Sequence, residues 1–169
     1  MSKNNPILQV KDLTVSFNAF AGKVQAVRGV SFDLNKGETL CIVGESGSGK
    51  SVTNKAIMGI LSKNAVIDRG EILYDGMDLT KLTEEQFCQI RGKRIAMVFQ
   101  DPLSALNPIM KVGKQITETL CVHQKLSHEQ AKKRALELMA AVGIPEPEKR
   151  FNQYPFQFSG GMRQRIVIV

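Results

Sequence analysis

The sequence predicts an α/β fold, because a short apolar run, a glycine-rich loop and an amphipathic helical pattern follow one another between residues 38 and 61. Residues 38–43, ETLCIV, are typical of a strand buried in a parallel sheet. Residues 44–51, GESGSGKS, fit the phosphate-binding pattern G-x-x-x-x-G-K-[ST]. Strand, loop and helix in this order form the setting that such a loop requires. The helical spacing is carried by Val52, Ala56, Ile57, Ile60 and Leu61.

The composition of the loop suits a ligand that is a chain of anionic oxygens. Backbone N–H groups surround such a ligand only where bulky side chains are excluded. Lys50 would place its ammonium against the β- and γ-phosphates, Ser51 would ligate Mg²⁺, and the following helix would point its positive end at the phosphates. A merely flexible loop is the alternative, but the four fixed positions would match by chance in fewer than about one chain in a hundred. We therefore expect a nucleoside triphosphate to contact Gly44, Glu45, Ser46, Gly47, Ser48, Gly49, Lys50 and Ser51.

Composition and charge limit the class of protein. Hydrophobic residues make up 43% of the chain and charged residues 23%, which is ordinary for a soluble domain with one core. No apolar run approaches about 18 residues, and the N-terminus lacks the apolar stretch of a signal peptide. Cys41, Cys88 and Cys121 are widely spaced, which favours a reducing cytosolic setting over a zinc site or a disulfide framework. The net charge of +7 comes from dispersed residues, which is typical of a solvated surface. Binding to nucleic acid, to an anionic membrane or to nucleotide phosphates is the alternative explanation of this charge.

The first forty residues predict antiparallel β-structure. Apolar and polar residues alternate over residues 13–17 and again over residues 30–34, with a turn at residues 21–23 between them. A hairpin is predicted over residues 71–79, because Asp75-Gly76 is a strong signal for a two-residue turn.

A short helix and a second buried strand are predicted next. Thr83 and Gln86 form a capping box at the start of the helix, where Leu82 can pack on Phe87. Residues 94–100, RIAMVFQ, are typical of a buried strand that ends in a polar residue.

Helical patterns dominate after Asp101. Ser127 and Gln130 form a second capping box, and an apolar face follows that is typical of core packing. Gly143 and Pro145 end this helix. The face consists of Ala131, Ala135, Leu138, Met139 and Val142.

A second candidate anion site lies near the end of the sequence. Ser159 can cap a helix, and Gly160 and Gly161 would expose its first backbone N–H groups. Taken alone, an S-G-G triplet is more often an ordinary loop-to-helix junction.

Three spaced motifs give the chain a specific resemblance to the nucleotide-binding subunits of ABC transporters, over essentially all 169 residues. GESGSGKS matches the family's Walker A motif, Gln100 matches the Q-loop, and FSGGMRQR matches the signature motif usually written LSGGQ. Phe17 stands in the place of the aromatic residue that stacks on adenine. The stretches AVRGVSF, VFQDPLSALNP and YPFQFSGGMRQR are closer still to the ATPase subunits of peptide and nickel importers, with the oligopeptide and dipeptide permeases nearest.

The resemblance implies a P-loop NTPase fold of ABC type, with a RecA-like core, an antiparallel β-subdomain and a helical subdomain, incomplete at the C-terminus. Residues 1–100 would hold the β-subdomain and the P-loop part of the core, and residues 101–169 the helical subdomain that ends in the signature motif. The family's Walker B Asp-Glu pair, D-loop and switch histidine would follow residue 169. We therefore expect this chain alone to bind ATP weakly and to hydrolyse it negligibly. His123 and His128 precede the signature motif and are expected to be surface residues.

The resemblance also implies a role for the other motif residues. Phe17 would stack on adenine, with a packed strand residue as the plainer alternative. Gln100 would contact Mg²⁺ and position the attacking water. The signature residues would contact ATP bound to the opposite subunit of a head-to-tail dimer, and Met162, which replaces the generic Gln, offers no side-chain hydrogen bond there. These signature residues are Ser159, Gly160, Gly161 and Met162.

As a family assignment, the chain is expected to be an importer ATPase that couples ATP hydrolysis to uptake of di- or oligopeptides or a related solute. Its implied partners are a second ATPase subunit, identical or different, integral-membrane permease subunits contacted by residues 101–108, and indirectly an extracytoplasmic solute-binding protein. It would be cytoplasmic and peripheral on the inner face of the membrane. Two alternatives are a soluble ABC ATPase acting on nucleic acid or ribosomes, against which FQDPLSALNP counts, and a non-catalytic nucleotide-binding protein. No nucleic-acid partner is expected.

Overall fold

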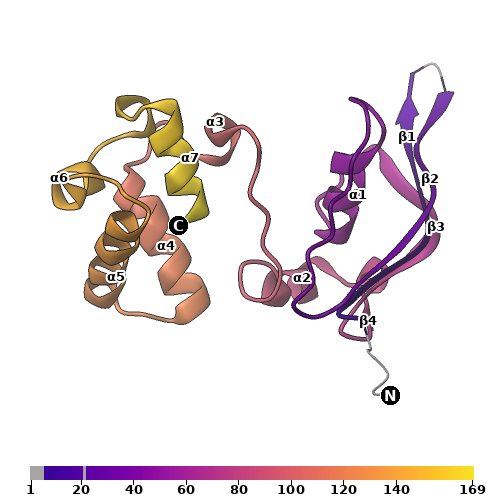
Figure 1. The fold of residues 1–169 in the computed structure, drawn as a ribbon, viewed down its shortest axis with the longest axis horizontal. Coiled ribbons are helices and arrows are strands. Elements are labelled where there is room, and N and C mark those ends of the chain that lie inside the picture. Colours follow the sequence, from indigo (N-terminus) through magenta and orange to yellow (C-terminus); the bar gives the residue numbers. More distant parts are fainter. Residues whose placement is uncertain (1–5, 21) are drawn as a thin grey trace. The chain divides into compact units, whose positions relative to one another are not determined.

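The computed structural model describes residues 6–20 and 22–169, with only the backbone of Leu103. The chain divides into two compact units, Met1–Ala96 and Met97–Val169, which follow one another along the colour bar of Figure 1 and are described separately. The sequence-based boundary after residue 100, and the assignment of both parts to one ATPase domain, stay predictions.

An antiparallel sheet with the strand order β2-β1-β3-β4 forms the first unit (Figure 1). The central strand β1 pairs with β2 on one side and with β3 on the other, so the predicted antiparallel structure is confirmed. The predicted turn at residues 21–23 lies partly outside the described residues, because Ala21 is not described. The strands are β1 (Leu8–Ala19), β2 (Gly22–Leu34), β3 (Ala65–Tyr74) and β4 (Met77–Asp78).

The predicted hairpin joins β3 to β4. Its two-residue turn consists of Asp75 and Gly76, which have φ angles of 50° and 79°. Positive φ at both central residues is what a two-residue hairpin of this kind requires, and Asp-Gly meets it at low cost.

One extra residue interrupts the pairing of β1. Between Lys11 and Thr14, β1 advances by three residues while β3 advances by two. Asp12 has a left-handed φ of 49° there, and a Cβ added to Gly70 of β3 would lie 2.6 Å from the Asp12 carbonyl oxygen. Gly70 therefore allows the two backbones to approach closely at this β-bulge.

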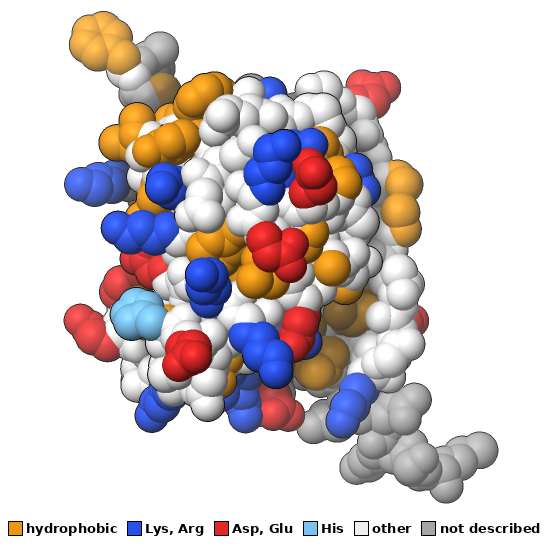
Figure 2. All heavy atoms as spheres, turned by 90° about the vertical axis from the view of Figure 1, so that its left-hand side faces the viewer, with side chains coloured by type: hydrophobic (Ala, Val, Ile, Leu, Met, Phe, Trp, Pro, Cys, Tyr) orange, Lys and Arg blue, Asp and Glu red, His pale blue; other side chains and the backbone are white. Residues whose placement is uncertain are grey.

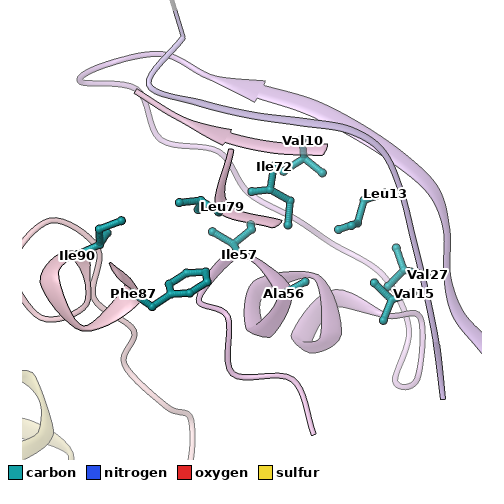
Figure 3. Close-up of a cluster of buried hydrophobic side chains, with 10 residues drawn as sticks. All are labelled: Val10, Leu13, Val15, Val27, Ala56, Ile57, Ile72, Leu79, Phe87 and Ile90. Atoms are coloured by element: carbon teal, nitrogen blue, oxygen red, sulfur yellow. The ribbon is translucent and has the colours of Figure 1, made fainter. Parts of the chain in front are cut away.

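The core of this unit lies between the sheet and the helices α1 (Lys50–Ile57) and α2 (Glu84–Ile90). Figure 3 shows side chains from all these elements converging, with the short 3₁₀ helix η1 (Leu79–Lys81) contributing Leu79. The predicted capping box of α2 is confirmed, since Thr83 and Gln86 bond to each other's backbone N–H groups. The buried residues are Val10, Leu13, Val15, Val27, Ala56, Ile57, Ile72, Leu79, Phe87 and Ile90.

Two predicted strands are absent from the described part of the chain. Residues 38–43 form no strand, and Val43 is 82% exposed. Residues 94–100 contain only one end of an isolated bridge between Arg91 and Ile95. Both predictions are wrong for the same physical reason. A strand exists only where a neighbour completes its hydrogen-bond ladder, and no described strand pairs with either segment.

The second unit is helical and has its own apolar core, formed by side chains from α4 to α7 and the loops between them. In α5, Ala131, Ala135 and Met139 are fully buried, which confirms the predicted apolar face. The predicted capping box of α5 is also present, and the helix ends before Gly143, which has a φ of 73°. The helices are α3 (Pro102–Ala105), α4 (Val112–Gln124), α5 (His128–Ala141), α6 (Pro147–Phe151), the 3₁₀ helix η2 (Pro155–Gln157) and α7 (Gly160–Ile168).

Charges of both signs are interspersed on the face of the molecule that Figure 2 shows. None of the helices within residues 6–20 and 22–169 combines the length and the apolar character needed to cross a membrane.

Candidate functional site

The glycine-rich loop folds around the side chain of its own lysine. Lys50, the first residue of α1, directs its Nζ to the Gly44 carbonyl oxygen at 2.7 Å and to the Glu45 carbonyl oxygen at 2.6 Å. The same ammonium lies 3.2 Å from Ser48 Oγ, and the Ser48 N–H donates to the Glu45 carbonyl oxygen at 3.2 Å. These contacts hold a cation among the oxygen atoms of a tight backbone turn.

Close contacts surround two glycines of the loop, and one of these contacts is with backbone. A Cβ at Gly49 would lie 2.6 Å from the Ala26 carbonyl oxygen and 3.2 Å from Val27 Cγ2, so this residue seats the start of α1 against β2. A Cβ at Gly44 would lie 2.7 Å from Ser48 Oγ. Gly47 differs, because it has open space around it but a φ of 83°. The loop conformation therefore depends on glycine at position 49 for steric reasons and at position 47 for backbone reasons, whereas the contact at Gly44 is with a side chain that can rotate away.

The start of α1 suits an anion. Its first turn contains no acidic residue, so no carboxylate offsets the positive end of the helix. Buried Thr53 fixes this turn, because its N–H and its hydroxyl both donate to the Gly49 carbonyl oxygen, at 2.8 and 3.1 Å. Ser51 is exposed in the same turn, where its hydroxyl is accessible to a ligand or a cation.

Phe17 lies on β1 of the same unit and is half-buried. Its neighbours in the sheet are Val24 on β2 and Ala65 on β3. A half-buried aromatic residue at this position fits both strand packing and contact with a planar ligand, so stacking on adenine stays a prediction.

The other predicted site residues belong to the second unit. Gln100 is exposed at a bend of the chain. Ser159 caps α7, with its Oγ accepting a hydrogen bond from the Met162 N–H at 3.4 Å. A Cβ at Gly160 or Gly161 would meet no heavy atom within 4 Å, so the first turn of α7 is open. The side chain of Met162, in contrast, packs against the core.

Sequence reasoning missed two arginines that fix α7. The Arg163 Nε donates to the carbonyl oxygen of Phe158, which is buried, at 2.8 Å. The Arg165 Nη1 donates to the carbonyl oxygens of Val142 and Gly143, at 3.2 and 2.8 Å, and so ties α7 to the end of α5. No local signal marks the second contact, because Arg165 lies 23 residues after Val142 and 22 residues after Gly143.

Gln115 was also missed, and it shapes the loop that precedes α4. Its side chain accepts a hydrogen bond from the Asn107 N–H at 2.9 Å and donates to the carbonyl oxygens of Asn107 and Met110, at 3.0 and 2.9 Å. Ile109 lies within this loop and is 85% exposed.

A family model described as ABC transporter matches residues 27–169 of the chain. The chain belongs to the ABC transporter family. The resemblance inferred from the three motifs, and the fold class that it implied, are thereby confirmed.

Curated relatives of this family member are ATP-binding proteins of peptide transport. The oligopeptide transport ATP-binding protein OppD of Bacillus subtilis (strain 168) is 61% identical over 163 residues, which cover 96% of this chain and 46% of OppD. The dipeptide transport ATP-binding protein DppD of Lactococcus lactis subsp. cremoris (strain MG1363) is 58% identical, with 96% and 47% covered. The chain thus spans about half the length of the curated relatives that it matches.

Solved ABC cassettes have a similar structure. The dimeric bacterial ABC transporter cassette MJ0796 matches with a TM-score of 0.82 and 28% identity, covering 95% of this chain and 67% of the cassette. The same cassette has been solved in a post-hydrolysis state bound to ADP and Pi, with the same TM-score. CbiO1 of Clostridium perfringens, part of an ABC transporter complex, matches with a TM-score of 0.69 and 26% identity, covering 96% of this chain and 59% of CbiO1.

Proposed function

We propose that residues 44–51 bind the phosphates of ATP in an ATPase subunit that drives peptide uptake. The observation that carries this proposal is the position of Lys50 Nζ, held within 2.7 Å of two loop carbonyl oxygens at the start of a helix without acidic residues in its first turn. A glycine-rich backbone turn, an ammonium held within it and a positive helix end together match a polyphosphate in charge.

The residues present also fit a magnesium nucleotide. Ser51 offers an accessible hydroxyl next to the phosphate position, which is the ligand type that Mg²⁺ takes in such sites. Mg²⁺ would supply charge neutralisation at the β- and γ-phosphates. Gln100 is a further candidate oxygen ligand, and Phe17 is the candidate for contact with adenine.

The signature residues are proposed to serve a second subunit. Gly160 and Gly161 leave the first turn of α7 open, while Ser159 caps it. An open helix start of this kind suits the phosphates of a nucleotide held by a partner ATPase subunit. The dimeric state of the MJ0796 cassette supports such an arrangement.

The transported solute is proposed from the relatives. OppD and DppD, at 61% and 58% identity, are named for oligopeptide and dipeptide transport. The whole protein would accordingly act in the cytoplasm at the inner face of the membrane, bound to permease subunits through residues 101–108, and a solute-binding protein would deliver peptides from outside.

Calorimetric titration of the purified protein with ATP and Mg²⁺ tests the nucleotide site. Lys50→Ala should weaken binding by about tenfold or more, because it removes a charge-assisted contact worth about 1.5–3 kcal/mol. Lys55→Ala is the matched control, since Lys55 is an exposed cation on the same helix, and it should change the dissociation constant by less than about twofold. Equal ATP binding by the unaltered protein and Lys50→Ala would refute the proposed site.

A second measurement addresses the solute. Cells that lack the gene should lose uptake of labelled di- or oligopeptides, and the intact gene should restore it, whereas the Lys50→Ala gene should not. Normal peptide uptake in the deletion strain, with DNA binding by the protein that weakens as salt rises, would favour the nucleic-acid alternative instead.

A further inference from the structure

The far end of α1 is closed by a specific hydrogen-bonded turn. The Gly59 N–H donates to the Ala56 carbonyl oxygen at 3.1 Å, and the Ile60 N–H donates to the Lys55 carbonyl oxygen at 2.9 Å. With a φ of 63° at Gly59, this is a Schellman motif. It satisfies the carbonyl groups of Lys55 and Ala56 in the last turn of the helix. The carbonyl groups of Met58 and Gly59 follow directly after the helix and accept from another donor.

Arg91, which caps the C-terminal end of α2, supplies these donors. Its Nε bonds to the Met58 carbonyl oxygen at 2.8 Å, and its Nη2 bonds to the Gly59 carbonyl oxygen at 2.9 Å. The planar guanidinium thus grips two successive carbonyl groups with two of its donors. A cation at this position also complements the negative end of the α1 dipole.

The guanidinium is itself held by two neighbours. Its carbon lies 4.6 Å from the centre of the Phe87 ring, and its Nη1 and Nη2 form a forked contact with the Glu84 carboxylate, at 2.5 and 3.1 Å. The Arg91 side chain is only 21% exposed as a result. Stacking and a forked ion pair restrict its rotamers, so the donors are presented to α1 in a fixed orientation.

Phe87 completes the junction between the two helices. Figure 3 shows its ring pointing from α2 towards Ile57, near the end of α1. A Cβ at Gly59 would lie only 2.5 Å from this ring, so the ring rests directly on the glycine backbone. The turn at the end of α1 therefore has contacts from both Phe87 and Arg91.

We propose that Arg91 is a positioning residue for the phosphate-binding loop, an inference that rests on the proposed nucleotide site. Helix α1 has eight residues, or about 12 Å at about 1.5 Å per residue, so its two ends are only about two turns apart. Its first end is seated by Gly49 against β2, and its last end is gripped by Arg91. Loss of the grip lets the helix shift or fray, and this displaces Lys50 and Ser51 from their positions at the phosphates.

ATP titration of Arg91→Ala tests this role, at a temperature where circular dichroism shows the variant fully folded. We expect ATP with Mg²⁺ to bind about tenfold more weakly, because residues that do not touch a ligand can still alter its affinity by this order. Arg94→Ala is the matched control. Arg94 is an exposed arginine three residues along, and its removal should change the affinity by less than about twofold. Arg91→Lys should recover only part of the loss, since an ammonium lacks the planar fork.

Hydrogen exchange separates positioning from general stability. In Arg91→Ala the amides of α1 should exchange faster, while those that pair β1 with β2 should keep their protection. An equal loss of protection in both regions, or unchanged ATP affinity in Arg91→Ala, would overturn the inference. Failure of the unaltered protein to bind ATP would instead refute the proposed nucleotide site. Should Arg91→Ala not fold, Arg91→Lys takes its place: this variant should weaken ATP binding by about threefold or more, because the ammonium lacks the planar fork, and unchanged binding would count against the inference.

Discussion

Replacing Gly49 by alanine tests whether the start of α1 is seated as closely against β2 as the structure indicates. Gly49 has a φ of 93°, and an added Cβ would lie 2.6 Å from the Ala26 carbonyl oxygen. Gly47 provides a matched control within the same loop, because its φ of 83° is similar but a Cβ there would meet nothing within 4 Å. Alanine at either position is strained by the backbone, whereas only position 49 adds a steric conflict.

The expected cost follows from these two contributions. A left-handed φ costs an L-residue about 1–2 kcal/mol, and alanine recovers about 0.4–1 kcal/mol by restricting the unfolded chain. Gly47→Ala should therefore destabilise the first unit by about 1 kcal/mol. Overpacking against a backbone carbonyl adds about 1–3 kcal/mol, so Gly49→Ala should cost about 2–4 kcal/mol. The difference between the variants isolates the contact with β2.

Hydrogen exchange of peptides from β1 and β2 along a urea series measures the free energy of unfolding for this unit. ATP titration of the same samples should show weaker binding for both variants, and more so for Gly49→Ala. If the two variants lose the same stability within about 0.5 kcal/mol, the close seating of α1 on β2 is refuted.

Two further predictions concern a helix contact and an ion pair. Gly113→Ala should destabilise the second unit by about 1–3 kcal/mol, because the new Cβ would lie 2.4 Å from the Phe151 ring. Gly161→Ala is the control, since Gly161 is also helical but has open space around it, and this variant should lose no stability. Urea denaturation measures the free energy of unfolding of both variants. The hydrogen bond from Arg91 lowers the pKa of Glu84 below its usual 4.5, so the stabilisation by this pair is complete above about pH 4.5 and is lost as the pH falls through the lowered pKa. A carboxyl-carbon NMR titration should show the Glu84 pKa returning towards 4.5 in Arg91→Ala, and an unchanged pKa would contradict the pairing.

Features with local causes were predictable from the sequence. Asp75-Gly76 specifies its turn through its own backbone preferences, and the boxes at Thr83 and Ser127 use residues three positions apart. The loop at residues 44–51 was predictable because its contacts are also local: Lys50 bonds to carbonyl groups only five and six residues before it.

Features that depend on distant partners were not predictable. The apolar runs at residues 38–43 and 94–100 have strand composition, but a strand needs a neighbouring strand that composition does not supply. The grip of Arg91 on Met58 spans 33 residues, and its geometry arises only when α2 packs on α1. Gly59 carried a partial signal, because a glycine directly after an apolar helical pattern is typical of a helix end.

The bulge in β1 changes how the sequence of this strand has to be read. Val10 and Leu13 are three positions apart, an odd spacing that would put them on opposite faces of a regular strand, yet both are buried in the same cluster. The extra residue at Asp12 restores the phase between them. Deleting one residue between Val10 and Leu13 would leave an even spacing, which places both side chains on the same face of a regular strand without a bulge. The deletion should therefore preserve the buried face of β1, and it would remove the close approach of Gly70 to the Asp12 carbonyl oxygen.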